Sequence, residues 1–173
     1  MRLNTVLSLF RYLILFAAMA WGGVSLAQVP TGASAAVRSD QVTAQLLAYA
    51  PEGVPTGDAA RSGQAVIWLG LKLEHAPQWH TYWKNTGDSG LPTELHWDLP
   101  AGVEVGEVQW PTPQKIRVGD LANYGYEDTV LLPVPLIVSA DYQPPLLADS
   151  MELGLRATWL VCKQECIPQD GEF

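Results

Sequence analysis

The sequence predicts an all-β sandwich, and two observations support that prediction. Apolar and polar residues alternate over several short stretches, which is the period of a strand that buries one face. After residue 27, no stretch repeats its apolar residues with the period of an amphipathic helix. Short strands separated by turns rich in Pro and Gly are typical of two sheets packed face to face.

The strands of the first half are predicted from alternation and from the turns between them. Residues 41–49 form the first candidate strand, and the loop 51–63 that follows is rich in Pro, Gly and Asp. Residues 67–74 alternate Ile or Leu with Trp, Gly, Lys and Glu, as a half-buried strand does. Residues 95–99 alternate again, and residues 103–110 are the next candidate strand.

The second half contains one strand with prolines and one with a long, regular alternation. Residues 129–139 are apolar but include Pro133 and Pro135, which cannot donate to a sheet ladder, so an edge or bulged strand is expected there. From residue 151 to 161 every second residue is apolar, and Cys162 falls in phase with the opposite, polar face. The sequence therefore predicts that Cys162 faces outward.

Cys162 and Cys166 are the only cysteines of the chain, and three residues separate them. In an extended strand such residues lie about 13 Å apart, whereas a disulfide requires Cα atoms within about 7 Å. A bond between them therefore needs a turn over residues 163–165. So small a ring stabilises by only about 2 kcal/mol, against about 4.7 for a 100-residue loop. Thiol–disulfide exchange is the favoured interpretation, while a local structural disulfide and a metal-binding pair remain open.

Residues 1–27 are predicted to be a cleavable secretory signal peptide. Arg2 and Arg11 supply positive charge, and an apolar run follows at 12–21. Ser25-Leu26-Ala27 places small residues at the −3 and −1 positions of a cleavage site. The run is shorter than the ~20 apolar residues that a membrane-spanning helix needs. We expect export to the periplasm, an oxidising compartment where disulfides persist.

Cleavage after residue 27 would leave 146 residues (173 − 27), enough for one domain. Residues 28–36 are small and polar and are expected to form a flexible leader before a domain at 37–173. Because the chain stops at Phe173, soon after the cysteine turn, that domain is expected to be incomplete at its C-terminus. The exported part carries 8 basic and 18 acidic side chains, a formal charge of −10, which argues against nucleic-acid and anionic-membrane partners.

No cofactor and no metal site are expected. His75, His80 and His96 would suit copper together with the cysteines, but no two of them stand at a recognisable ligand spacing. Ser89 has no evident His/Asp partners, which argues against a hydrolase. Four tryptophans are expected to pack in the core and loops and not to form a ligand cage: Trp79, Trp83, Trp97 and Trp110.

Several segments together resemble the N-terminal periplasmic domain of DsbD-type thiol:disulfide interchange proteins, and more narrowly the branch that includes ScsB. The likeness covers about residues 37–173. The segments that carry it are Trp-His-Thr-Tyr-Trp-Lys-Asn at 79–85, Gly-Asp-Ser-Gly-Leu-Pro at 87–92, Trp-Pro-Thr-Pro at 110–113, Asn-Tyr-Gly-Tyr-Glu at 123–127, Trp-Leu-Val-Cys at 159–162 and Cys-Ile-Pro at 166–168.

The resemblance implies an immunoglobulin-like β-sandwich that carries a redox-active disulfide and acts as part of a protein-disulfide reductase. Such a domain receives electrons from a thioredoxin-like domain of the same full-length protein. A membrane-embedded domain, anchored in the inner membrane, supplies that domain in turn. Electrons pass on to periplasmic disulfide isomerases or to thioredoxins of cytochrome c maturation. Membrane contact is expected only through those further domains.

The resemblance also implies roles for individual residues. Cys166 matches the cysteine that forms mixed disulfides with partners, and Cys162 matches the one that resolves them. Tyr124 and Tyr126 are the best match for an aromatic cap loop that covers the pair until a partner arrives. This loop and the cysteine spacing both depart from the DsbD pattern. The alternative function is a non-catalytic sandwich that binds a partner and uses the cysteines structurally or for copper.

Overall fold

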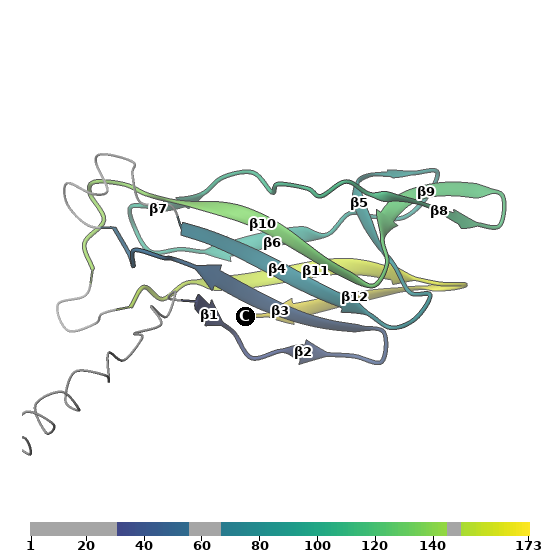
Figure 1. Ribbon diagram of the computed structural model, residues 1–173, viewed down its shortest axis with the longest axis horizontal. Helices are drawn as coiled ribbons and strands as arrows, with labels where there is room; N and C mark the ends of the chain where they lie inside the picture. Colours follow the sequence, from purple (N-terminus) through teal and green to yellow (C-terminus); the bar gives the residue numbers. More distant parts are fainter. Residues whose placement is uncertain (1–30, 56–66, 145–149) are drawn as a thin grey trace, which may run out of the picture.

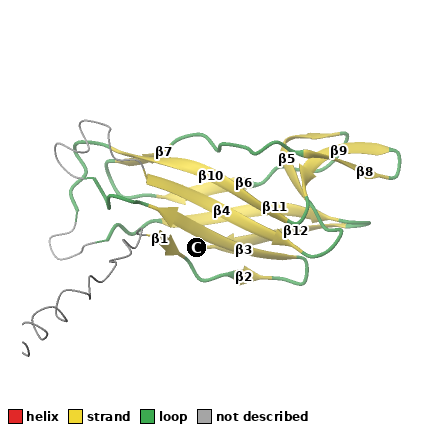
Figure 2. Cartoon of the chain, in the orientation of Figure 1, coloured by secondary structure: helices red, strands yellow, loops and turns green. Residues whose placement is uncertain are grey.

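The computed structural model describes residues 31–55, 67–144 and 150–173, and the expected signal peptide lies outside these ranges. Every regular element in the described residues is a β-strand, as Figure 2 shows, so the predicted all-β class is confirmed. Among these residues there is no helix of a length and hydrophobicity that would cross a bilayer.

The larger layer of the sandwich is a six-stranded antiparallel sheet with the order β1-β3-β4-β10-β7, in which β2 also pairs with β3. The long central strands β3 and β4 pair in register along their whole length, so each residue that faces inward on one has an inward-facing neighbour on the other. The strands of this sheet are β1 (Thr31–Ala33), β2 (Val37–Arg38), β3 (Val42–Tyr49), β4 (Ile67–His75), β7 (Val103–Val105) and β10 (Thr129–Val138).

Two three-stranded sheets complete the fold. One has the order β12-β11-β6 and forms the opposite layer of the sandwich; its strands are β6 (Glu94–Asp98), β11 (Gly154–Cys162) and β12 (Cys166–Glu172). The other has the order β5-β9-β8 and lies at one end of the sandwich (Figure 1); its strands are β5 (Thr81–Gly87), β8 (Gln114–Val118) and β9 (Leu121–Tyr126).

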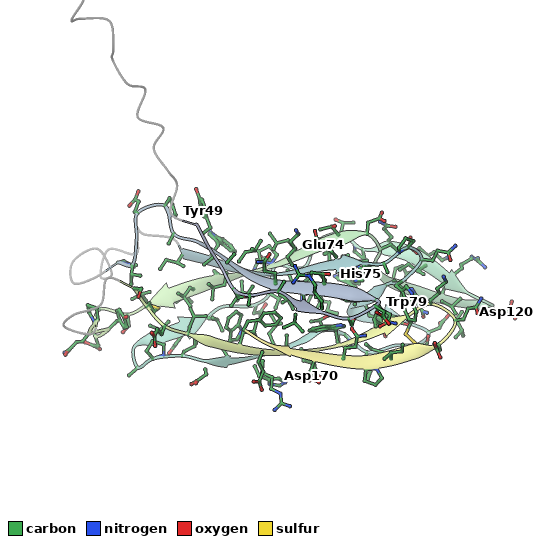
Figure 3. All side chains as sticks on the ribbon, turned by 90° about the horizontal axis from the view of Figure 1, so that it is seen from below. Tyr49, Glu74, His75, Trp79, Asp120 and Asp170 are labelled. Carbon is green, nitrogen blue, oxygen red and sulfur yellow. A yellow bond between two sulfur atoms is a disulfide. The ribbon has the colours of Figure 1, made fainter. Side chains whose placement is uncertain are left out.

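The core lies between the two layers, which the two views in Figures 1 and 3 show as separate sheets. The alternation predicted for β11 is confirmed, because its apolar residues are the buried ones. Each fully buried Leu or Val contributes roughly 1.5–3 kcal/mol. The central core residues are Val42, Ala44, Leu69, Leu71, Leu73, Val130, Leu132, Leu136, Leu155, Ala157, Trp159 and Val161. The four tryptophans predicted to pack, Trp79, Trp83, Trp97 and Trp110, are partly buried against this core.

The backbone groups of Pro133 and Pro135 in β10 point away from β4, to a side on which these two residues have no regular strand partner. The carbonyls of Pro133 and Pro135 accept hydrogen bonds from the N–H groups of Gln109 and Gly106, at 2.8 and 2.9 Å. The missing N–H of each proline therefore points the same way, and the ladder to β4 on the other side stays intact. The expectation of an edge or bulged strand is nevertheless wrong, because β10 lies between β4 and β7 and keeps an unbroken register with β4. The prolines are tolerated because they stand beyond the short pairing with β7, where no regular ladder needs their N–H groups.

The strand expected over residues 103–110 is shorter than predicted. It ends at Val105, because the prolines of β10 offer carbonyls but no N–H groups to the residues beyond. Residues 31–33, expected to lie in a flexible leader, pair with β3 as β1. Strands β2, β5, β8, β9 and β12 were not predicted, because they are short, polar or interrupted by Gly and Pro.

Gly125 on β9 lies directly against the backbone of β5. A Cβ atom at this position would lie 2.1 Å from the carbonyl oxygen of Thr81, a distance that real contacts essentially never reach. We predict that Gly125→Ala lowers the free energy of unfolding by about 1–3 kcal/mol through overpacking. Denaturant unfolding of Gly154→Ala is the control, since its Cβ meets nothing closer than 3.4 Å. Equal unfolding midpoints for the two variants would contradict the β5–β9 packing.

Candidate functional site

The two cysteines lie opposite each other where β11 ends and β12 begins. Their sulfur atoms are bonded, and their Cα atoms are 4.1 Å apart. The predicted turn is confirmed over residues 163–165, where the N–H of Lys163 donates to the carbonyl of Glu165 at 3.0 Å. The hairpin lies at the same end of the molecule as the turn between β8 and β9, which carries Asp120 (Figures 1 and 3).

The two cysteines differ sharply in exposure. Cys162 has only 2% of its surface exposed, whereas Cys166 is exposed. The sequence predicted the correct phase for Cys162, opposite the apolar face of β11, but the expectation that it faces solvent is wrong. Residues that come from outside β11 cover it.

His80 pairs with Cys162 as a residue of a neighbouring strand would. The N–H of Cys162 donates to the carbonyl of His80, and the N–H of His80 donates to the carbonyl of Cys162, both at 2.9 Å. Residues paired in this way have their side chains on the same face of the sheet. His80, Cys162 and Cys166 therefore form one row across three chain segments.

Tyr82 connects His80 to the exposed cysteine. Its hydroxyl lies 3.4 Å from Nε2 of His80 and 3.9 Å from Sγ of Cys166. The two rings also meet edge to face, with centroids 5.2 Å apart. Sequence reasoning did not assign either residue to the site. The available signal was their spacing, because residues two apart on a strand share a face.

Close packing fixes the ring of Tyr82. A Cβ atom on Gly90 would lie 2.3 Å from the ring, and Gly90 has a φ of +94°, so only glycine fits this position without strain. Pro92 bridges to Tyr82 on one side, and Gly125 of β9 pairs with it on the other. The hydroxyl position beside Cys166 is therefore set by the fold.

A buried asparagine fixes the loop that holds Gly90. Asn123 is fully buried, and its Oδ1 accepts hydrogen bonds from the backbone N–H and the hydroxyl of Ser89, at 3.0 and 3.1 Å. Next to it, Oδ2 of Asp88 accepts from the N–H of Ala122 at 2.8 Å. The 87–90 turn is thereby tied to β9 and not free to leave Tyr82.

Burial sets the protonation of the residues beside the disulfide. It lowers the pKa of His80 below its usual 6.5, and the neighbouring His75 lowers it further. Burial also raises the pKa of Tyr82 above 10. At neutral pH the imidazole is therefore neutral and the phenol keeps its proton. Tyr82 can thus donate a hydrogen bond to a thiolate on Cys166.

His75 ties the end of β4 to the start of β10. Its Nδ1 lies 2.9 Å from the carbonyl oxygen of Asp128, so this nitrogen carries the proton and donates. Its Nε2 lies 3.0 Å from the hydroxyl of Thr81 and accepts from it. Burial lowers the pKa of His75, and the hydrogen bond to Asp128 only partly offsets that effect.

The two tyrosines expected to form a cap occupy different environments. Tyr126 is 5% exposed, and its hydroxyl donates to the carbonyl of Pro111 at 2.8 Å; burial raises its pKa to about 12. Tyr124 is 36% exposed on β9, and the structure places it opposite Lys115 of β8. The described residues hold no group of three or more His, Cys, Asp or Glu arranged for a metal ion.

The family model for the N-terminal region of the thiol:disulfide interchange protein DsbD matches residues 51–173. That is most of the chain, and it includes the paired cysteines and the segment with His80 and Tyr82. This chain belongs to that family. No curated protein matches it.

A solved structure gives the same fold. The N-terminal periplasmic domain of ScsB from Proteus mirabilis matches with a TM-score of 0.54 and 21% sequence identity, over 83% of this chain and 50% of that one. The immunoglobulin-like sandwich of the DsbD family is thereby confirmed. This chain spans about half the length of the ScsB chain.

We predict that Tyr82→Phe raises the pKa of Cys166 in the reduced protein, because the thiolate loses a hydrogen-bond donor. One hydrogen bond of about 1 kcal/mol corresponds to an upward shift of roughly 0.5–1 pH unit. The pH dependence of iodoacetamide alkylation measures this shift. Tyr142→Phe, at a buried tyrosine beside Gly102, is the control. An identical profile for both variants would show that the Tyr82 hydroxyl does not act on Cys166.

A second prediction concerns stability at low pH. A histidine whose pKa is lowered in the folded state binds fewer protons there than in the unfolded chain, whose histidines titrate near 6.5. The free energy of unfolding therefore falls as pH drops from about 7.5 towards 5. We expect His75→Gln to show a smaller fall in urea midpoint than the wild type, and the exposed His96→Gln to match the wild type. A steeper or unchanged slope in His75→Gln would refute the assignment.

Proposed function

We propose that this chain is a periplasmic thiol–disulfide exchange domain in which Cys166 meets partner proteins and Cys162 resolves the mixed disulfides. The observation that carries this proposal is the unequal exposure of the pair: Cys166 is open to solvent, and Cys162 is 2% exposed. Because only Cys166 is open to solvent, a partner thiolate can approach along the S–S axis only at the sulfur of Cys166. Membership of the DsbD family supports exchange over a purely structural bond.

The exchange moves two electrons in two steps. A donor thiolate attacks Sγ of Cys166, the disulfide breaks, and Cys162 leaves as a thiolate that takes up a proton. The second thiolate of the donor then attacks the mixed disulfide, which releases Cys166 as a thiolate and leaves the donor oxidised. The reduced pair passes the electrons on when Cys166 attacks the disulfide of the next protein and Cys162 resolves the product.

The surrounding residues favour attack at Cys166. Tyr82 keeps its proton and stabilises the Cys166 thiolate through its hydroxyl, 3.9 Å away. His80 holds Cys162 through two backbone hydrogen bonds, so the buried sulfur stays in place while the exposed one changes partners.

In the full-length protein, this domain receives electrons from a thioredoxin-like domain fed through the inner membrane. It delivers them to periplasmic disulfide isomerases or cytochrome maturation thioredoxins. This relay and the reductase activity are inferences from the family. Export to the periplasm is inferred from the signal peptide predicted over residues 1–27. The cap role is proposed for the segment with Tyr124 and Tyr126, since its exposed Tyr124 lies on the sheet at the disulfide end of the sandwich.

The single-cysteine variants test the assigned roles. We predict that Cys162→Ser, which keeps the exposed thiol, forms a mixed disulfide with oxidised glutathione at least about tenfold faster than Cys166→Ser. Mass spectrometry at timed intervals measures both rates. Both variants lose the same ring, worth about 2 kcal/mol, so their stabilities serve as the control. Equal rates, or a faster Cys166→Ser, would contradict the proposed roles.

A further inference from the structure

A groove of about 280 Å³ lies on the outer face of the β12-β11-β6 sheet, next to the disulfide. It is just smaller than the roughly 300–1,000 Å³ of pockets that enclose small molecules, so it suits one or two side chains of a protein. The groove residues that matter here are Leu91, Pro92, Glu94, Leu160, Pro168 and Asp170. Figure 3 shows Asp170 on the outer side of β12, away from the core.

The groove is in register with the disulfide. Leu160 pairs with Pro168 two residues along from the Cys162–Cys166 pair, and two residues further Thr158 pairs with Asp170 on one side and Glu94 on the other. Residues two apart on a strand share a face and are about 6.6 Å apart. The groove therefore starts roughly 7 Å from the disulfide with apolar side chains and reaches the carboxylates after roughly 13 Å.

The two parts of the groove have different chemistry. Leu91 is 65% exposed and forms an apolar wall with Pro92 beside the Leu160–Pro168 pair. At the far part, Glu94 and Asp170 contribute negative charge, and no described residue that lines the groove is basic. His96 lies 3.6 Å from Glu94, outside the groove, and Asp170 forms no ion pair with any described residue. The groove thus complements an aliphatic side chain followed by a cation.

A partner is not expected to bind here by adding a strand to the free edge of the sheet at β12. Leu155 and Phe173 exchange both backbone hydrogen bonds, so every second residue of β12 counted from Phe173 points its N–H and C=O groups at β11. The residues in between, Pro168 among them, point these groups away from β11. Pro168 then offers no N–H at the free edge of the sheet. A partner strand along β12 would lose a hydrogen bond at its centre, which favours recognition through side chains in the groove.

We propose that this groove selects the protein partners of the exchange reaction by the residues around their reactive cysteine. The occupant is an extended partner segment with an aliphatic residue two positions from its cysteine and Lys or Arg four positions from it. An extended chain advances about 3.3 Å per residue, so these positions reach the apolar wall and the carboxylates while the cysteine bonds to Cys166. The proposal rests on the exchange function and specifies its substrate class.

Synthetic peptide thiols test the proposal on the oxidised protein. One peptide carries Leu two residues from its cysteine and Lys four residues from it, and the reference peptide carries Ser and Glu at the same two positions. Each peptide is made in two versions, with these residues either before or after the cysteine. For each peptide, the second-order rate constant for reduction of the Cys162–Cys166 disulfide is divided by the rate constant of the same peptide with 2-hydroxyethyl disulfide. This ratio removes differences in intrinsic thiol reactivity. We expect the Leu/Lys peptide to be about tenfold faster in one direction, equivalent to about 1.4 kcal/mol.

Variants of the groove residues show which part of the groove causes the preference for the Leu/Lys peptide. Leu91→Ser removes the apolar wall at an exposed residue, and the double variant Glu94→Gln, Asp170→Asn removes the charge. Each is expected to reduce the preference at least threefold, while reduction by dithiothreitol stays unchanged. The controls are Ile137→Ser, exposed on the other sheet, and Glu104→Gln, exposed on β7.

The possible outcomes distinguish failure of the groove proposal from failure of the exchange function. Equal normalised rates for the peptides, or a preference that survives in the groove variants, would overturn the groove proposal and leave exchange intact. Failure of every thiol, dithiothreitol included, to reduce the pair would overturn the exchange function and the groove proposal together.

Discussion

The backbone pairing of Cys162 is the constraint on which the site depends. This single residue ends β11, faces Cys166 on one side and exchanges two hydrogen bonds of 2.9 Å with His80 on the other. Its position is therefore fixed by two neighbouring segments, and its sulfur is covered. Cys166 begins β12 just beyond a three-residue turn and stays exposed. The difference in exposure between two chemically identical residues follows from this difference in backbone neighbours.

Much of the fold could be predicted from the sequence, because strands that bury one face carry a period of two. The inner faces of β4 and β11 were predicted this way. The sheet at the end of the sandwich was not, since its strands depend on tertiary contacts: Gly125 against the backbone of Thr81, and Asn123 bonded to Ser89. Such contacts join segments far apart in the chain and leave no local period.

The redox pair could be predicted from cysteine spacing and family resemblance, but its surroundings could not. The phase of Cys162 was correct and its exposure was wrong, because alternation says which face a residue occupies and not what covers that face. His80 and Tyr82 reach the disulfide through tertiary contacts, of which the pairing of His80 with Cys162 spans 82 positions (162 − 80). A pairing of that range has no signature in a single sequence.

The reduction potential of the Cys162–Cys166 pair distinguishes an exchange disulfide from a structural one. The chain would be equilibrated in graded glutathione buffers, its thiols trapped, and the two forms counted by mass. We predict a value within roughly −180 to −270 mV, the range of proteins that exchange disulfides with partners. A value below about −300 mV would identify a structural disulfide and contradict the exchange function.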